Sequence, residues 1–385
     1  MRAVVCQNGD LEVRDVAPPE PGRGQLVLDV LACGICGSDL HARHHADEAG
    51  EAIAASGYAD FMRGTDAVVL GHEFCGEVVE AGRGARIRPG TRVVAMPIAR
   101  AHGGVHLTGL TPKLGGGYAE QVLVQQALTF PVPNGLDTDI AAMTEPMAVA
   151  LHAVRRGAVA RGQVAIVIGC GPIGLGVIAM LKAQGVRTVV ASDFSPARRA
   201  LAERMGADVV VDPSLDSPYE VPGARFLDAP GLLELAVGSM EKLRAVPLLP
   251  WHHVMRAAER LGAGPSGPVV FECVGVPGML DGVLEAAPLY SRVVVVGVCM
   301  GQDSLRPALG INKEIELRFV LGYTPVEFAE TLGLLADGTV DPRPLLTGRV
   351  GLDGVAEAFT VLGDPEAHAK IMVRPQQVGG GVSPV

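Results

Sequence analysis

The chain has little of what several large protein classes require. It has no excess of basic residues, because 32 Lys and Arg stand against 42 Asp and Glu, a formal net charge of −10. Nucleic-acid binding draws most of its affinity from a basic face, so this balance argues against a nucleic-acid partner. Only 4% of the residues are aromatic, which leaves no obvious stacking platform for a large flat ligand.

Signals for export or membrane insertion are also missing. Asp10, Glu12 and Asp15 interrupt the first apolar residues, so no signal peptide is predicted. Residues 164–181 carry no charge and reach the length of a membrane helix. Helix breakers interrupt this stretch, namely Gly169, Gly171, Pro172, Gly174 and Gly176. We therefore expect a strand, a tight turn and a helix start there, and no membrane partner.

The cysteines do not suggest a disulfide framework. They are odd in number and scattered, at positions 6, 33, 36, 75, 170, 273 and 299. Together with the missing signal peptide, this pattern predicts a cytoplasmic protein in a reducing environment. Cys33 and Cys36 form a C-x-x-C pair, which also occurs in redox-active sites, but no thioredoxin-like βαβ unit surrounds it.

What is present indicates two domains. The 385 residues, 48% of them apolar, exceed one average domain. The first part, 1–150, consists mostly of short β-branched runs separated by glycine and proline. Strands predicted at 164–168, 188–191, 209–211, 269–273 and 292–296 then alternate with helices at 173–184 and 196–205. This order predicts an α/β domain over 151–298 with a doubly wound parallel sheet.

Two further stretches complete the outline. Residues 213–250 form a long, proline-rich insertion with an apolar stretch at 232–237. We interpret it as an elaborated crossover, with a lid over a cofactor or an oligomer contact as alternatives. Beyond residue 300 we expect strands at 312–320 and 367–374, a helix at 325–336 and a flexible tail.

A glycine-rich turn marks a dinucleotide site. Gly169, Gly171 and Gly174 form a G-x-G-x-x-G pattern that follows a strand and opens a helix, with Pro172 and Ile173 inside the turn. Asp193 ends the next strand, where a carboxylate accepts the ribose hydroxyls and repels a 2′-phosphate, which favours NAD over NADP. Arg198 and Arg199 can hold a phosphate and complicate this preference. Asp193 can also serve only as a turn residue ahead of Ser195.

A second group of residues has the chemistry of a zinc site. A catalytic zinc needs three protein ligands and an open position. Cys36 offers a thiolate, His72 an imidazole, and Glu73 or Glu145 a carboxylate. This mixture suits zinc better than magnesium or calcium, which prefer oxygen ligands alone.

The motifs together resemble a known family. Residues 31–41, the Gly71-His72-Glu73 string and residues 145–152 closely resemble the zinc-dependent medium-chain alcohol and polyol dehydrogenases, in the sorbitol, threonine and butanediol dehydrogenase-like branch. The resemblance runs to about Pro375. It implies a GroES-like, mostly-β catalytic domain, completed by the returning segment 299–385, and a Rossmann NAD-binding domain between the two parts.

The resemblance also implies roles for single residues. Cys36 and His72 match zinc ligands, Glu145 matches the third ligand, bound directly or through water, and Glu73 matches an acid that can approach the metal. Asp39 matches the carboxylate that orients the zinc-bound histidine. Ser38 matches the hydroxyl that exchanges a proton with the substrate, and His41 the relay that passes it to solvent. At the cofactor, the resemblance places Arg198 on the ribose and the strand ends with Val274, Val296 and Val298 around the nicotinamide.

The expected activity is hydride transfer between NAD and an alcohol, with a secondary alcohol, diol or polyol as the expected small-molecule substrate. Many family members carry a second, structural zinc on four cysteines, but Arg92–Glu120 contains none, so one zinc per chain is expected. The resemblance further implies a homotetramer or homodimer. We interpret the segment 42–70, with His44 and His45, as longer than in relatives and expect it at the pocket rim, with extra metal ligands as an alternative.

Two other functions stay open from the sequence. One is a zinc-free enone or quinone reductase of the same superfamily, which would lack the set of Cys36, His72 and Glu145. The other is a catalytically silent nucleotide-binding protein that has kept the fold.

Overall fold

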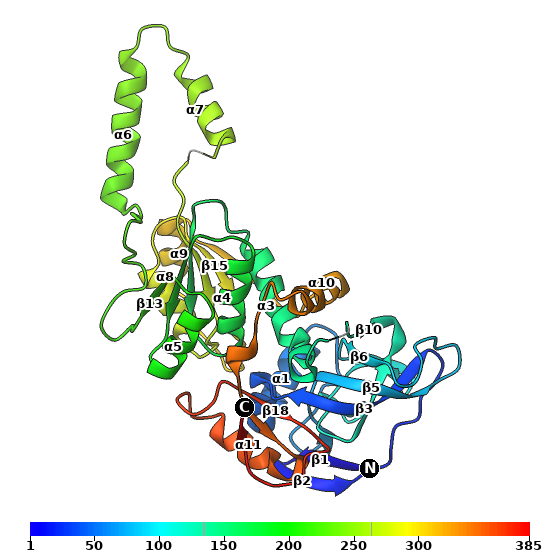
Figure 1. The fold of residues 1–385 in the computed structure, drawn as a ribbon. Coiled ribbons are helices and arrows are strands. Elements are labelled where there is room, and N and C mark those ends of the chain that lie inside the picture. Colours follow the sequence, from blue (N-terminus) through cyan, green and yellow to red (C-terminus); the bar gives the residue numbers. More distant parts are fainter. Residues whose placement is uncertain (134, 263) are drawn as a thin grey trace.

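The computed structural model describes residues 1–133, 135–262 and 264–385, which form two lobes and a long projection (Figure 1). The first lobe is mostly β and the second is built on a parallel sheet. Within the described residues, no helix combines the length and the apolar character that crossing a membrane requires.

The strands of the first lobe form two larger sheets and one small hairpin. A three-stranded sheet has the order β2-β1-β4, and a mixed sheet has the order β10-β6-β5-β3-β18-β17-β19, with β9 also paired to β3. The hairpin joins β7 and β8. The N-terminal strands are β1 (Arg2–Gln7), β2 (Asp10–Asp15), β3 (Gln25–Gly34), β4 (Val68–Val69), β5 (Glu73–Ala81), β6 (Arg92–Ala95), β7 (Ile98–Ala101), β8 (Gly104–Leu107), β9 (Gln121–Gln125) and β10 (Thr129–Pro131).

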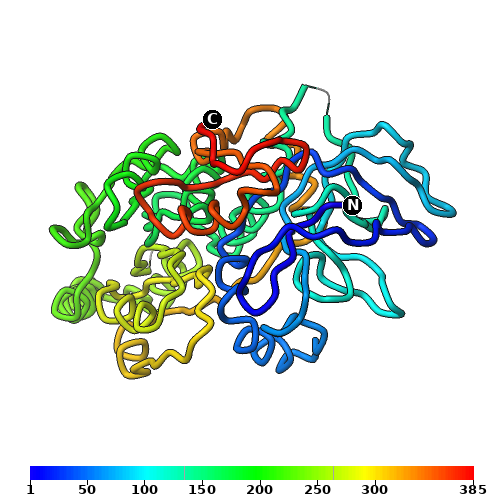
Figure 2. The backbone as a smooth tube through the Cα atoms, turned by 90° about the horizontal axis from the view of Figure 1, so that it is seen from below, coloured from blue at the N-terminus to red at the C-terminus, as the bar shows by residue number. Residues whose placement is uncertain are grey.

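The C-terminal segment returns to this lobe. Figure 2 shows the segment, in red, running close to the N-terminal strands, in blue. β18 (Lys370–Val373) pairs antiparallel with β3, so that Met372 faces Gly34. The other elements of the segment are β17 (Leu346–Val350), α11 (Val355–Val361) and β19 (Ser383–Pro384). The tail was predicted to be flexible, but β19 pairs with β17, which satisfies backbone groups on that sheet edge.

The second lobe holds the predicted parallel sheet. Its order is β13-β12-β11-β14-β15-β16 and every neighbouring pair is parallel. β11 is an apolar run buried almost throughout, as expected for a strand covered on both faces. The strands are β11 (Val164–Ile168), β12 (Thr188–Ser192), β13 (Val209–Val211), β14 (Val269–Glu272), β15 (Arg292–Val295) and β16 (Glu316–Phe319). Helices α4 (Pro172–Ala183), α5 (Pro196–Arg204), α8 (Met279–Ala286) and α9 (Pro307–Lys313) connect them.

One predicted strand was wrong at its start. Residues 312–320 were expected to be extended, but Asn312 and Lys313 end α9, which begins with Pro307 in its first turn and stops at Glu314 with a left-handed φ of 49°. Proline at a helix start favours the helix. β16 then begins at Glu316 and pairs with β15, so the parallel sheet extends beyond residue 298.

Helices at the junction link the lobes. α3 (Thr144–Gly157) packs against α4 and α10 (Pro325–Ala336). α10 has a capping box of Thr324 and Glu327, which fixes the helix start that the sequence predicts. α2 (Thr138–Ala142) precedes α3, and α1 (Gly37–Ala54) follows β3. Short 3-10 turns cover Gln126–Leu128, Arg343–Leu345 and Leu352–Gly354.

The crossover from β13 to β14 forms the projection. α6 (Ala229–Ala245) and α7 (Trp251–Arg260) extend away from the second lobe (Figure 1). We call residues 229–260 the projecting hairpin.

Candidate active site

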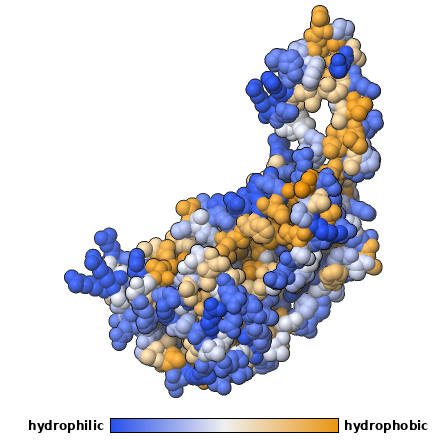
Figure 3. Space-filling view, turned by 180° about the vertical axis from the view of Figure 1, so that it is seen from behind, coloured by the Kyte–Doolittle hydropathy of each residue, from blue (hydrophilic) through white to orange (hydrophobic). Residues whose placement is uncertain are grey.

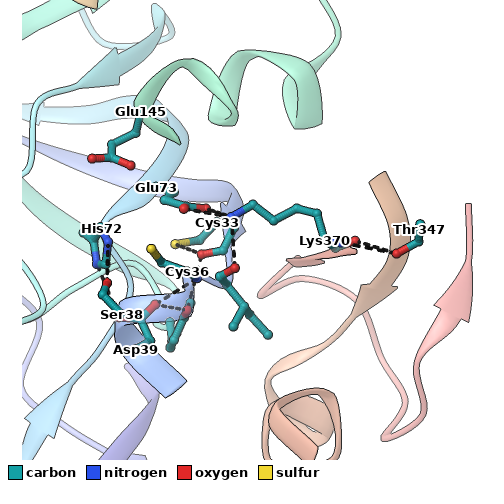
Figure 4. Close-up of polar contacts among 12 residues, drawn as sticks. Cys33, Cys36, Ser38, Asp39, His72, Glu73, Glu145, Thr347 and Lys370 are labelled. Atoms are coloured by element: carbon teal, nitrogen blue, oxygen red, sulfur yellow. Dashed lines mark hydrogen bonds and ion pairs between the residues drawn. The ribbon is translucent and has the colours of Figure 1, made fainter. Parts of the chain in front are cut away.

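Three potential metal ligands meet where β3 and β5 lie side by side. Cys36 precedes the first turn of α1, directly after β3, and His72 and Glu73 stand at the start of β5. One ligand atom from each lies within 4.8 Å of the others (Figure 4). A thiolate, an imidazole and a carboxylate at this spacing fit zinc. Gly71 makes the approach possible, because it has a φ of 98° and a Cβ there would lie 2.6 Å from Tyr118.

A buried carboxylate orients His72. Asp39 Oδ1 lies 3.3 Å from His72 Nδ1. Asp39 Oδ2 accepts hydrogen bonds from the Tyr118 hydroxyl at 2.5 Å and the Cys36 amide at 3.2 Å. Burial alone would raise the pKa of Asp39, but His72 and these donors lower it below its ordinary value. With Nδ1 facing Asp39, Nε2 of His72 is the nitrogen left for a metal.

A lysine that the sequence analysis missed neutralises Glu73. Lys370 on β18 donates to Glu73 Oε1 at 2.8 Å and to the Ile35 carbonyl at 2.9 Å. Both charged side chains are buried. Burial would lower the pKa of Lys370, but Glu73 above all raises it, so the ammonium stays charged. The returning strand thus completes the site.

Glu145 faces the cluster from another element. It lies in the first turn of α3 on the far side of the cluster (Figure 4), outside the three-residue group. Its Oε1 accepts a hydrogen bond from the Tyr323 hydroxyl at 2.9 Å. Burial raises its pKa to about 7, although the nearby His72 opposes the shift. A cation in the cluster would favour its ionised form.

The predicted proton path starts at the same cluster. Ser38 Oγ lies 3.4 Å from His72 Nε2. His41 lies one turn further along α1 and reaches the surface. Desolvation and, after it, the nearby His45 lower the pKa of His41. His44 and His45 are exposed and do not belong to the metal cluster. Residues 42–54 continue α1.

The glycine-rich turn borders a cavity of about 960 Å³ at the carboxyl ends of the parallel strands. Gly169 has a φ of 88°, and a Cβ on Gly174 would lie 1.9 Å from the Gly169 carbonyl. Pro172 stands in the first turn of α4 and Ile173 follows it. Gly169 and Gly174 therefore let the turn and the helix pack closely, and this brings the N-terminus of α4 to the cavity.

Half of the ten predicted cofactor residues line this cavity. They are Gly169, Gly171, Asp193, Arg198 and Val274. Asp193 accepts hydrogen bonds from the Cys170 amide at 2.7 Å and the Ser195 amide at 2.9 Å, so it also holds the turn. Val296 and Val298 do not line the cavity; Val296 is buried and Val298 is exposed. Tyr219, which the sequence analysis did not single out, does line it.

Comparisons with known proteins agree with this geometry. The family "Alcohol dehydrogenase GroES-like domain" matches residues 22–134, and "Zinc-binding dehydrogenase" matches residues 172–223. The (R,R)-butanediol dehydrogenase of Bacillus subtilis is 32% identical over 95% of this chain and 97% of its own. Sorbitol dehydrogenase of Bos taurus is 28% identical over 92% of this chain and 91% of its own.

Solved structures show the same relationship. The crystal structure of 2R,3R-butanediol dehydrogenase from Bacillus subtilis matches with a TM-score of 0.73, covering 97% of this chain and 99% of that one at 32% identity. A zinc-binding dehydrogenase from Sinorhizobium meliloti 1021, bound to NADP, matches with a TM-score of 0.74 at 28% identity, covering 97% and 99%. The chain therefore belongs to the zinc-dependent medium-chain alcohol and polyol dehydrogenases, a family of NAD(P)-linked oxidoreductases.

Proposed function

We propose that this chain oxidises secondary alcohols or vicinal diols with NAD and reduces the corresponding ketones. One zinc ion per chain would be held by Cys36, His72 and a carboxylate of Glu73 or Glu145. The observation that carries this proposal is the convergence of three ligand atoms within 4.8 Å beside a carboxylate-oriented histidine. The names of the butanediol and sorbitol dehydrogenases support the substrate class.

The chain's own residues supply the proton path. Zinc, when bound, makes the substrate hydroxyl more acidic. Ser38 accepts that proton and passes it toward His41, which releases it to solvent because it reaches the surface. Asp39 fixes the ring of His72 through Nδ1 throughout. A nicotinamide cofactor, when bound in the cavity, would accept the hydride that the substrate carbon loses.

We assign NAD rather than NADP as the cofactor. Asp193 lines the cavity, and its carboxylate would repel a 2′-phosphate while accepting the ribose hydroxyls. Arg199 is already engaged, because its guanidinium donates to the Asp193 and Phe194 carbonyls and pairs with Asp212 at 3.1 Å. Arg198 is the other cation at the cavity, and we assign it to the ribose.

The proposal also covers the number of zinc ions, the cellular location and the oligomeric state. The segment that carries a structural zinc in many relatives contains no cysteine and holds the β7–β8 hairpin instead, which supports a single zinc. The seven cysteines are free in the structure, which fits the cytoplasm. We propose a homotetramer with two-fold symmetry, which after the two-fold dimer is the commonest closed arrangement of identical subunits.

The test is a substrate screen on the purified protein. NADH formation is followed with (R,R)-butanediol, sorbitol and simple secondary alcohols, with NAD or NADP, before and after zinc chelation. We expect turnover with a diol or secondary alcohol that prefers NAD and stops on chelation. Turnover of enones or quinones by zinc-free protein would instead support the reductase alternative. Zinc and NAD binding without turnover of any alcohol would support the silent protein.

A further inference from the structure

The projecting hairpin takes no part in the proposed reaction. It lies apart from the metal cluster and contributes no residue to the lining of the cofactor cavity (Figure 1). Neither α6 nor α7 contains a buried residue. The projecting hairpin is therefore not a lid over the cofactor and does not pack on the sheet, whereas the first part of the insertion does, with Tyr219 lining the cavity and Val221 in the core beside the strands.

The hairpin is nevertheless rich in apolar side chains. Figure 3 shows hydrophobic residues along the projection and at its tip. On α6, Leu233 is 68% and Val237 57% exposed, and Leu248 at the tip is fully exposed. On α7, Trp251, Val254, Met255 and Ala258 recur every three or four residues, the spacing of an apolar stripe on one helix face.

Such helices need a partner in water. Isolated helices shorter than about 12–15 residues are marginal on their own, and α7 has 10 residues. The exposed apolar side chains of the hairpin are Leu233, Leu235, Val237, Val246, Leu248, Trp251 and Val254. Each is at least 39% exposed, so together they offer roughly several hundred Å², the order of the ~800 Å² that each partner buries in a standard-size interface.

We propose that the hairpins of two copies of this chain pack against each other, with α6 of one along α7 of the other in a two-fold symmetric four-helix interface. The charges allow this arrangement. α6 carries Glu234 and Glu241 together with Lys242 and Arg244, and α7 carries Arg256 and Arg260 together with Glu259. Because each helix offers both signs, a second copy related by a two-fold axis can pair acids with bases. The interface is independent of the proposed activity.

The mixed charges of the projecting hairpin argue against a membrane surface as its binding partner. Helices that bind anionic lipid carry mainly Lys and Arg on their polar face. The projecting hairpin mixes both signs, with Glu259 between Arg256 and Arg260, and the whole chain has a net charge of −10. The hairpin therefore suits a protein partner of similar mixed charge, which a second copy provides.

The test is the mass of the full chain in solution, measured by light scattering after gel filtration at about 10 μM. The double variant Leu233→Glu/Val237→Glu places charges on α6, and Trp251→Glu/Val254→Glu does so on α7. All four side chains are exposed in the protomer, and Glu is a good helix former, so each subunit should keep its fold. Val378→Glu is the matched control, because Val378 is 96% exposed and lies outside the hairpin.

We expect both double variants to have half the mass of the wild type, with the NADH affinity per chain unchanged because the two lobes stay folded, and the control to keep the full mass. A monomeric wild type, or an unchanged mass in both double variants, would overturn the proposal. Sedimentation with phosphatidylcholine and phosphatidylserine vesicles tests the alternative that the hairpin binds a membrane surface and not a second copy. Wild-type binding that both double variants lose, at unchanged mass, would assign the hairpin to a membrane surface instead.

Discussion

The ion pair of Lys370 and Glu73 allows a quantitative test of how the returning strand supports the site. Lys370→Met removes the ammonium but keeps most of the side-chain volume. It leaves a buried Glu73 carboxylate without its cation and the Ile35 carbonyl without its donor. Breaking a buried ion pair by removing one partner costs about 3–5 kcal/mol. We expect a loss of that size in the free energy of unfolding of zinc-stripped protein.

Two variants show whether the loss comes from the unpaired charge. Adding Glu73→Gln to Lys370→Met removes the buried carboxylate, so at least half of the lost stability should return. Lys113→Met is the matched control, since Lys113 pairs with Asp60 at 2.5 Å but is 41% exposed, and surface pairs contribute only about 0–1 kcal/mol.

Urea unfolding followed by circular dichroism measures these differences. The fluorescence of the only tryptophan, Trp251, is unsuitable, because it lies on exposed α7 and far from the pair. A loss below about 1 kcal/mol in Lys370→Met, or no recovery in the double variant, would refute the reasoning. Zinc should reduce the loss, since its charge also compensates Glu73.

Three further predictions concern the reaction. Ser38→Ala should lower kcat by roughly 100-fold or more with NADH affinity unchanged; an unchanged kcat in steady-state assays would remove Ser38 from the proton path. Because desolvation and His45 hold the pKa of His41 below its ordinary value, the proton-accepting form persists to lower pH. His45→Gln removes one of these causes and should raise the pKa of His41. As the pH is lowered in a pH–rate profile, the activity of the variant should therefore begin to fall at a higher pH than that of the wild type. An identical profile would contradict the relay. Asp193→Ala should reduce the preference for NAD over NADP by about tenfold or more, and an equal kcat/KM ratio in both proteins would refute its assignment.

Much of the fold could be predicted from local patterns. The apolar run Val164–Ile168 and the proline-started helix Pro325–Ala336 coincide with β11 and α10, because burial on both faces and helix capping leave clear signatures. The prediction for 312–320 was wrong at its start, because Pro307 begins a helix whose end depends on a left-handed residue, which a β-like composition does not reveal; the rest of the range holds β16.

The motifs that carry the potential zinc ligands could be predicted from the sequence, but the side chains that hold those ligands in place could not. Cys36, His72 and Glu73 follow from residue types that zinc requires. Lys370 pairs with a residue 297 positions away, and the only signal in the sequence was its place inside the predicted strand 367–374. The apolar stretch 232–237 left a crossover, a lid and an oligomer contact open, and it lies on exposed α6, because hydrophobicity alone does not tell an internal core from an external interface.

Zinc at the cluster of Cys36 and His72 is central to the proposed reaction. Elemental analysis of the purified protein, with Cys36→Ala beside it, measures zinc per chain. We predict one zinc in the wild type, and in the variant loss of zinc and of alcohol oxidation with NADH binding retained. A fully folded wild type without zinc, or a Cys36→Ala variant that still turns over alcohol without zinc, would contradict the account.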